Sequence, residues 1–328
     1  MKIINFTRSH MEEAQKIAIR NYEEERQLVP ILPRIFNLPE LIHFADNNLG
    51  VVALDGDKMV GFLCAYLPLE DAFGTTNAKG TFSPIHAHGV IGENRDRIYS
   101  KLYQAAAEKW VSEGIVSHAI ALYTHDKASI NSFFYNGFGL RCIDAIRPME
   151  ELPTLTDTPM ITGLNLEYCE VPRKEWGRLL EQHNALITHL GCSPTFMRFP
   201  QIDEEELYKR TSEEVRYFAA KKDGQYIAYI KIDTEGENFV TEDSSMMNIC
   251  GAYCNSQYRG TGIYRNLLLF LIIKLKAEGY TRLGVDCESF NPNARGFWLK
   301  YFTEYTHSVV RRIDDKAGKG KTYGGITL

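Results

Sequence analysis

A glycine-rich run at residues 255–264 has the composition of an anion-binding loop. Gly260 and Gly262 stand in the sequence Arg-Gly-Thr-Gly-Ile, after an apolar stretch typical of a strand and before one typical of a helix. Glycines at such a turn let backbone N–H groups face one concavity, because no Cβ stands in the way. The N–H groups of the first helical turn add the positive end of the helix dipole. The run therefore predicts a site for phosphate or pyrophosphate.

Two well-known phosphate-binding patterns do not fit this run. A dinucleotide-binding fingerprint requires a third glycine three residues after Gly262, and that position is Arg265. A P-loop requires Gly-Lys-Ser or Gly-Lys-Thr after four spacer residues, which the run lacks. A tight turn without any ligand stays open as the structural interpretation of a single Gly-x-Gly pair. A second motif is therefore needed to assign the ligand.

That second motif is Asn-Pro-Asn-Ala-Arg-Gly-Phe-Trp at residues 291–298. Together with residues 259–263 it resembles the acyl-CoA motifs of the GNAT superfamily of N-acetyltransferases, Arg/Gln-x-x-Gly-x-Gly/Ala and Asn-x-x-Ala-x-x-Phe-Tyr. The resemblance implies an enzyme that moves an acetyl group from acetyl-CoA to a small-molecule amine acceptor, without a metal. The residues that it assigns to acyl-CoA binding are Ala252, Tyr253, Cys254, Arg259, Gly260, Thr261, Gly262, Ile263, Tyr264, Asn291, Ala294 and Trp298.

The motifs depart from the family pattern at two positions. Tyr264 stands in place of a glycine or alanine, so its ring must point away from the pyrophosphate. Trp298 stands in place of a tyrosine whose hydroxyl often protonates the CoA thiolate in this family. Tyr301 and Tyr253 are the remaining candidates for that acid, and we predict Tyr301. The departures leave a catalytically silent acyl-CoA-binding module or sensor as an alternative function.

Transfer to an amine requires the amine to lose a proton first. An alkylammonium group with a pKa near 10.4 is neutral in about one molecule in 2,500 at pH 7, which is worth roughly 4.6 kcal/mol. Asp286 and Glu288 share one face at the end of a predicted strand, and Glu288, nearer the mouth, is the predicted general base. The resemblance also implies that backbone N–H groups of residues 252–254 stabilise the oxyanion.

Two other groups of reactive side chains have simpler interpretations. Cys254 lies beside the glycine-rich run, but the sequence places no histidine partner near it. Direct attack by the amine in a ternary complex is therefore expected. His86 and His88 share one strand face without an identifiable third ligand, so a structural role is predicted rather than a metal site.

Alternating strands and helices must position these motifs. A polar segment with two prolines, 150–159, has the composition of a linker, and predicts domains at 1–150 and 160–328. The predicted fold class is α/β (α+β), with two tandem GNAT-like domains that each have a mixed, mostly antiparallel sheet flanked by helices. Strands are expected at 2–7, 51–54, 58–67, 81–90, 118–124, 139–147, 163–170, 216–222, 225–233, 246–254, 282–287 and 305–313, and helices at 9–25, 95–113, 128–136, 173–190, 260–278 and 293–301.

The two halves align at one constant offset, which predicts an internal duplication. Ile98-Tyr99 aligns with Ile263-Tyr264, and at the same offset Glu113-Gly114 aligns with Glu278-Gly279. The first copy has lost both glycines of the loop, and its residues 93–99 include two carboxylates that would repel a pyrophosphate. We therefore predict that the first copy is degenerate and serves as a scaffold or as part of the acceptor pocket.

The composition of the chain limits its possible binding partners and its cellular compartment. Lys plus Arg is 37 and Asp plus Glu is 42, which gives a net charge of −5 and excludes the basic footprint of a nucleic-acid-binding protein. The seven cysteines form no Cys-x-x-Cys motif, as expected of free thiols in a reducing compartment. We see no signal peptide, and the longest apolar run, 267–273, is far shorter than the roughly 20 residues of a membrane span. A cytoplasmic protein is expected, and its oligomeric state stays open.

Overall fold

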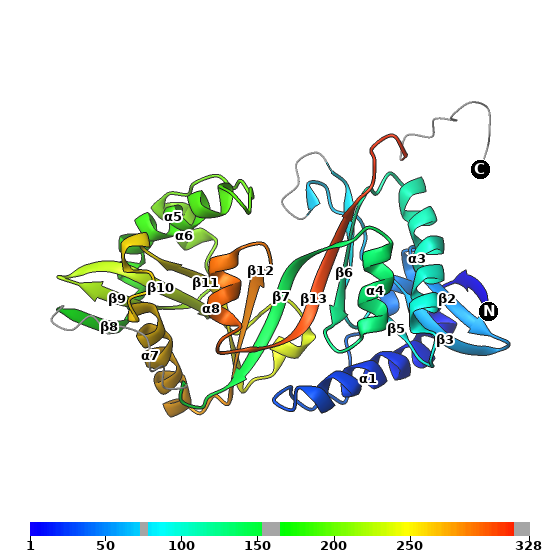
Figure 1. The fold of residues 1–328 in the computed structure, drawn as a ribbon, viewed down its shortest axis with the longest axis horizontal. Helices are drawn as coiled ribbons and strands as arrows, with labels where there is room; N and C mark the ends of the chain where they lie inside the picture. The colour runs from blue at the N-terminus through cyan, green and yellow to red at the C-terminus, as the bar shows by residue number, and fades with distance from the viewer. Residues whose placement is uncertain (73–77, 153–164, 318–328) are drawn as a thin grey trace. The chain divides into compact units, whose positions relative to one another are not determined.

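The computed structural model describes residues 1–72, 78–152 and 165–317 (Figure 1). Most of the predicted linker, 153–159, and the first two residues of the strand predicted at 163–170 lie outside the described residues. None of the helices in the described residues has the length and apolar character needed to cross a bilayer.

The chain divides into two compact units. Met1–Ile143 and Glu304–Leu328 form the first unit, and Asp144–Thr303 forms the second. The C-terminal strand is thus grouped with the first unit, whereas the sequence places it in the second half. It pairs antiparallel with a strand of the first unit, from Thr306↔Tyr123 to Arg312↔Ser117. The domain ranges 1–150 and 160–328 stay a prediction.

The first unit packs helices against antiparallel and mixed strands. The order of one sheet is β1-β2-β3-β5, with antiparallel pairs throughout. In the other, β6 lies between β4, which is parallel to it, and β13, which is antiparallel. The elements are β1 (Lys2–Asn5), η1 (Arg8–His10), α1 (Met11–Leu28), α2 (Ile42–Asp46), β2 (Val51–Asp55), β3 (Lys58–Leu63), β4 (Gly80–Ser83), β5 (His88–Val90), α3 (Arg95–Ser112), β6 (Ser117–Tyr123), α4 (Lys127–Tyr135) and, near the C-terminus, β13 (Thr303–Arg312).

The second unit is built on strands in the order β7-β12-β11-β10-β9-β8, of which β7 (Gly139–Pro148) begins in the first unit. Neighbours from β8 to β11 are antiparallel, and β11 and β12 are parallel. Helices α5 and α7 lie on opposite sides of these strands (Figure 1). The other elements are β8 (Leu166–Val171), η3 (Arg173–Leu179), α5 (Leu180–Gly191), α6 (Glu204–Lys209), β9 (Arg216–Lys222), β10 (Gln225–Asp233), η4 (Phe239–Glu242), β11 (Met246–Cys254), η5 (Ser256–Tyr258), α7 (Ile263–Ala277), β12 (Arg282–Glu288) and α8 (Pro292–Trp298).

The mixed α/β architecture with helices on its sheets confirms the predicted fold class, and two predicted elements are divided in the structure. The strand predicted at 81–90 is β4 and β5, which belong to different sheets. Pro84 has no N–H to offer a ladder, and the N–H of Ala87 bonds to the carbonyl of Pro84 at 2.8 Å, so the chain turns between the two strands. The helix predicted at 173–190 begins as the 3-10 helix η3 and continues as α5.

Elements of the two units recur at the offset found in the sequence. β6 and β12 have equal lengths, and their first residues, Ser117 and Arg282, stand at aligned positions. The helix before each strand is followed by a left-handed glycine, Gly114 at φ 76° and Gly279 at φ 97°. Such glycines end helices because they adopt positive φ without a steric penalty. These matches support the duplication, which stays a prediction.

Buried histidines are a feature of the first unit. The ring nitrogens of His88 lie 3.1 Å from the hydroxyl of Tyr99 and 2.6 Å from the carbonyl oxygen of Ala121. Both nitrogens are therefore used within the fold, which favours the structural role predicted for His88. Burial lowers the pKa of His86, His88 and His118 to about 4.

We expect the first unit to lose stability in acid. The pKa of each of the three histidines is about 4 in the folded chain and about 6.5 in the unfolded chain, so the unfolded state binds more protons between these values. Stability should fall as the pH drops from 6.5 to 4, by about 1.4 kcal/mol per pH unit for each histidine. Urea unfolding can be followed by Trp110 fluorescence in a Trp176→Phe, Trp298→Phe chain. His118→Gln should remove about a third of the slope of the unfolding free energy against pH. An unchanged slope would contradict this account.

Candidate functional site

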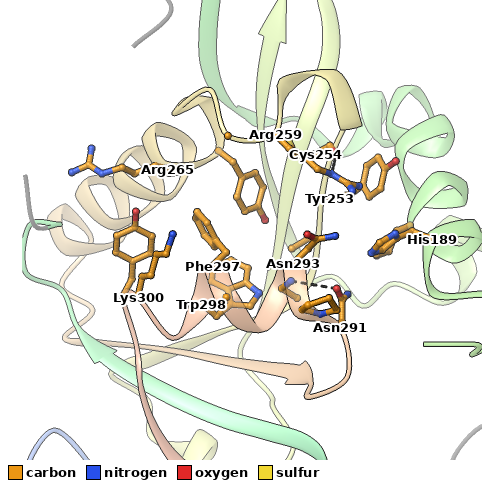
Figure 2. A pocket seen from close by; sticks show the side chains of 18 of the residues that line it. His189, Tyr253, Cys254, Arg259, Arg265, Asn291, Asn293, Phe297, Trp298 and Lys300 are labelled. Atoms are coloured by element: carbon orange, nitrogen blue, oxygen red, sulfur yellow. Dashed lines mark hydrogen bonds between the residues drawn. The ribbon is translucent and has the colours of Figure 1, made fainter. Parts of the chain in front are cut away.

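A cavity of about 620 Å³ lies in the second unit, where the ends of β11 and β12 meet α8 and the start of α7 (Figure 2). His189 projects from α5 toward the side of the cavity where Asn291 and Asn293 lie, and Arg265 and Lys300 lie at its other end. The lining residues are Leu186, His189, Ala252, Tyr253, Cys254, Arg259, Gly260, Gly262, Tyr264, Arg265, Asn291, Pro292, Asn293, Ala294, Gly296, Phe297, Trp298, Lys300 and Tyr301.

The glycine-rich loop opens the N-terminus of α7 onto this cavity. Gly260 has φ 74°, and Gly262, the N-cap of α7, has φ 83°, so both need the conformational freedom of glycine. The first intrahelical bond runs from the N–H of Asn266 to the carbonyl of Gly262 at 3.0 Å. The N–H groups of the residues between them have no partner within the helix and carry its positive dipole end.

The side chains of the loop hold its shape. The Nε of Arg259 donates to the carbonyl of Cys254 at 3.0 Å, and its guanidinium lies 5.3 Å from the ring centroid of Tyr253. The hydroxyl of Thr261 donates to the carbonyl of Tyr258 at 2.6 Å. These contacts tie the loop back to the end of β11 and keep the start of α7 facing the cavity.

Strands β11 and β12 form a fork beside the loop. Their parallel pairing runs from Met246↔Arg282 to Ile249↔Val285 and then stops, although both strands continue. Beyond that point β11 pairs with β10 up to Ala228↔Cys254, across a register shift near Lys231. The backbone of β11 that faces away from β10 therefore lines the cavity without a strand partner from β12.

The start of α8 supplies the wall of the cavity opposite the loop. The Asn291 side chain accepts the N–H of Ala294 at 3.3 Å and caps the helix, as the dashed line in Figure 2 marks. The ring of Tyr264 packs edge-on against Phe297 and Trp298, with centroids 5.0 and 6.0 Å apart. The Tyr264 hydroxyl reaches the carbonyl of Tyr229 at 3.5 Å. The ring of Tyr264 thus forms part of the wall.

A family model covers the segment that builds this cavity. Residues 184–302 match the model of the Acetyltransferase (GNAT) family. This segment has the sequence pattern of a GNAT acetyltransferase domain. No curated protein matches the chain by sequence.

Solved structures extend the likeness to most of the chain. A GCN5-related N-acetyltransferase from Sphaerobacter thermophilus has a TM-score of 0.58 at 11% identity, over 94% of this chain and 95% of that chain. A fungal glucosamine N-acetyltransferase region of a multi-domain GH3 β-N-acetylglucosaminidase has a TM-score of 0.51 at 13% identity, over 94% of this chain and 38% of that chain. At such low identity the likeness concerns the fold, and it confirms the GNAT fold predicted from the motifs.

Most of the residues predicted from the GNAT motifs lie around the one cavity, and three do not. The hydroxyl of Thr261 bonds within the loop, and Ile263 is buried beneath it. Glu288 is not among the residues that line the cavity. The predicted residues that line the cavity are Ala252, Tyr253, Cys254, Arg259, Gly260, Gly262, Tyr264, Asn291, Ala294, Trp298 and Tyr301.

Sequence reasoning missed several residues of the wall. Leu186 and His189 come from α5, which lies far before both motifs in the chain, and they share a helix face at a spacing of three. That spacing is the one signal in the sequence that could have paired them. Arg265 and Lys300 flank the two motifs and were omitted because the family pattern assigns them no role.

The ionisable side chains of the cavity favour an anionic ligand. Its charged residues are Arg259, Arg265 and Lys300, and among the described residues that line it there is no Asp or Glu. Together with the N-terminus of α7, this lining suits the several phosphate charges of a CoA molecule.

The thiol in the cavity is not activated. Burial raises the pKa of Cys254 to about 11, although Arg259 opposes the shift. The thiol is therefore protonated at neutral pH, and a protonated thiol is a poor nucleophile. This result favours direct attack by the acceptor over an acyl-enzyme.

Two glycines of the cavity wall should respond oppositely to alanine. Gly262→Ala forces a side chain into the left-handed region and should cost about 1–2 kcal/mol of unfolding free energy. Gly296→Ala adds a methyl inside α8 where no atom lies within 4 Å, and should stabilise the chain by up to about 1 kcal/mol. Thermal and urea unfolding of the two variants test the backbone geometry, and equal destabilisation by both would contradict it.

Proposed function

We propose that the second unit binds acetyl-CoA in this cavity and transfers the acetyl group to a small-molecule amine. The observation that carries the proposal is the N-terminus of α7, opened by two left-handed glycines onto a cavity whose charged side chains are all cationic. The pyrophosphate would bind at Gly260–Gly262, with Arg259 and Arg265 beside it.

All seven cysteines are free thiols, which supports the predicted cytoplasmic location.

The fork would hold the reacting end of acetyl-CoA. The free backbone edge of residues 252–254 can pair with the pantetheine amides as an added strand would. An N–H of the same stretch can stabilise the oxyanion that forms when the amine nitrogen attacks the thioester carbon. As the C–S bond breaks, the thiolate takes up a proton.

Tyr301 is the proposed donor of that proton. It lines the cavity one turn after Trp298, the residue that replaces the usual tyrosine of the family. Its ring packs edge-on against Phe297 at 5.2 Å, which holds the side chain on the cavity wall. The general base is proposed from the carboxylate pair Asp286 and Glu288 at the open end of β12, acting directly or through water.

The corresponding region of the first unit supports the prediction that it does not bind acetyl-CoA. At the offset that aligns the two copies, Arg95 corresponds to Gly260, and Asp126, which caps α4, corresponds to Asn291. The guanidinium of Arg95 pairs with Asp126 at 3.2 Å and with Glu24 at 2.5 Å. An anion bound there would meet two carboxylates and a cation already neutralised by them.

Matched substitutions in the two loops should separate the two units. Gly262→Asp adds a Cβ and a negative charge beside the proposed pyrophosphate, so acetyl-CoA affinity should fall at least about a hundredfold. Arg97→Asp at the aligned position of the first unit should change the affinity for acetyl-CoA less than about threefold. Isothermal titration with acetyl-CoA, and with NAD as a control ligand, measures both. Equal losses of acetyl-CoA affinity in the two variants would refute the assignment of binding to the second unit. Binding of NAD in preference to acetyl-CoA would refute the assignment of the ligand.

Removing the proposed acid should slow turnover without weakening binding. Tyr301→Phe should lower kcat by about 10- to 100-fold and leave the Kd for acetyl-CoA within about twofold, because only the departing thiolate needs the hydroxyl. The readout is CoA release with a panel of small amines. If the unaltered protein binds acetyl-CoA tightly and releases no CoA with any amine, the function is that of a sensor.

A further inference from the structure

His189, on the cavity wall, has ring nitrogens that the fold does not use. Its side chain is partly exposed and forms no hydrogen bond or ion pair within the part of the chain that the structure describes. His183, on the same helix, instead lies with its Nδ1 3.5 Å from the hydroxyl of Tyr229. A neutral imidazole has one nitrogen with a free lone pair, so the ring of His189 is able to accept a proton from a ligand in the cavity.

Helix α5 holds His189 in a fixed place. The buried side chain of Gln182 donates to the carbonyl of Tyr226 at 2.9 Å, and Asn184 exchanges two hydrogen bonds with the backbone of Ile202 at 2.9 and 3.0 Å. Leu186 stands one turn before His189 on the same helix face and packs against the core of the second unit. The histidine is therefore presented to the cavity by a helix that is anchored along its length.

No other side chain of the described cavity lining can readily accept a proton near neutral pH. Guanidinium and ammonium groups have no lone pair to offer, and phenols and thiols keep their own protons in this range. Burial raises the pKa of Cys254 to about 11 and that of Tyr264 well above its usual range. The ionisable side chains that share the cavity with His189 come from β11, the loop, α7 and the residues after α8, and they are Tyr253, Cys254, Arg259, Tyr264, Arg265, Lys300 and Tyr301.

The histidine also lies at the end of the cavity where the reaction is proposed. Figure 2 shows the rings of His189 and Tyr253 at one end and the cations Arg265 and Lys300 at the other. If the thioester is held at residues 252–254, an amine that attacks it has its nitrogen on the side where His189 projects. Asp286 and Glu288, by contrast, are not among the residues that line the cavity.

We infer that His189 is a catalytic residue that takes the proton from the acceptor amine. This inference rests on the proposed acetyl transfer, and it moves the first proton transfer from the carboxylate pair to His189, because only the histidine lines the cavity. An imidazole suits this role, since it changes its charge between about pH 5 and 8 without any special environment.

The transfer balances with the residues named. The ammonium group of the acceptor gives one proton to a ring nitrogen of His189, and the neutral amine nitrogen forms the new C–N bond with the thioester carbon. The C–S bond breaks, and the thiolate takes a proton from Tyr301, which recovers one from the former amine nitrogen. The products are the acetylated amine and CoA, and His189 releases its proton to solvent.

The test compares the unaltered protein with His189→Gln over a range of pH. With acetyl-CoA and a primary alkylamine that the unaltered protein acetylates, kcat/KM of the unaltered protein divided by that of the variant should be about a hundredfold at pH 8. The ratio should fall below about fivefold at pH 5, where a protonated imidazole accepts no proton. Taking the ratio cancels the ionisation of the amine itself, which both proteins share.

His183→Gln is the matched control, since it makes the same change on the same helix at a residue that does not line the cavity. The corresponding ratio for this variant should stay within about twofold at both pH values. Isothermal titration of both variants should give a Kd for acetyl-CoA within about twofold of the unaltered value, which also shows that they are folded.

The outcomes distinguish this inference from the function on which it rests. If the loss in His189→Gln is equal at pH 5 and pH 8, or if His183→Gln loses as much, His189 only shapes the wall and the inference is wrong. If His189→Gln keeps full activity while Glu288→Gln loses it, the carboxylate pair is the base and the transferase stands. If the protein binds acetyl-CoA and acetylates no amine at all, the proposed function fails and this inference fails with it.

Discussion

The loss of pairing between β11 and β12 after Ile249 and Val285 is the constraint on which the site depends. A continuous ladder would satisfy the backbone of residues 250–254 on both edges and leave no place for a ligand. Because β11 stays paired with β10 while β12 departs, one backbone edge is left for a partner of the right shape. The cavity, the loop and α8 are arranged around that edge.

Charge is distributed unevenly around the fork. The charged side chains on the cavity wall are cationic, whereas the carboxylates Asp286 and Glu288 lie on β12 beyond its last pair with β11. Burial first, and then the neighbouring carboxylates, raise the pKa of Asp286, so ionisation of this side chain opposes folding of the second unit. Proteins keep unfavourable electrostatics of this kind most often at functional sites.

The site and the fold could be predicted from the sequence only where the deciding residues are close in the chain. The loop with Gly260 and Gly262 carries a local signal, since left-handed turns restrict residue types. Leu186 and His189 reach the cavity from α5, a segment that lies far from both motifs in the chain. The strand predicted at 81–90 was wrong as a single element because apolar alternation continues through Pro84, although the proline prevents one ladder from doing so. Likewise, β13 belongs to the first unit through its pairing with β6, which no pattern within β13 specifies.

The aligned loops of the two units differ in the residue that stands at the start of the helix. In the second unit, Gly260 leaves a space that an anion can enter, and the adjacent helix start remains electropositive. In the first unit, Arg95 occupies the aligned position and carries its own counter-charges, Glu24 and Asp126. An ion pair that is largely shielded from solvent keeps the helix start tied to α1 and α4, so the structural contribution of a bound anion is replaced by side chains. The first unit can therefore hold the start of this helix in place with its own side chains.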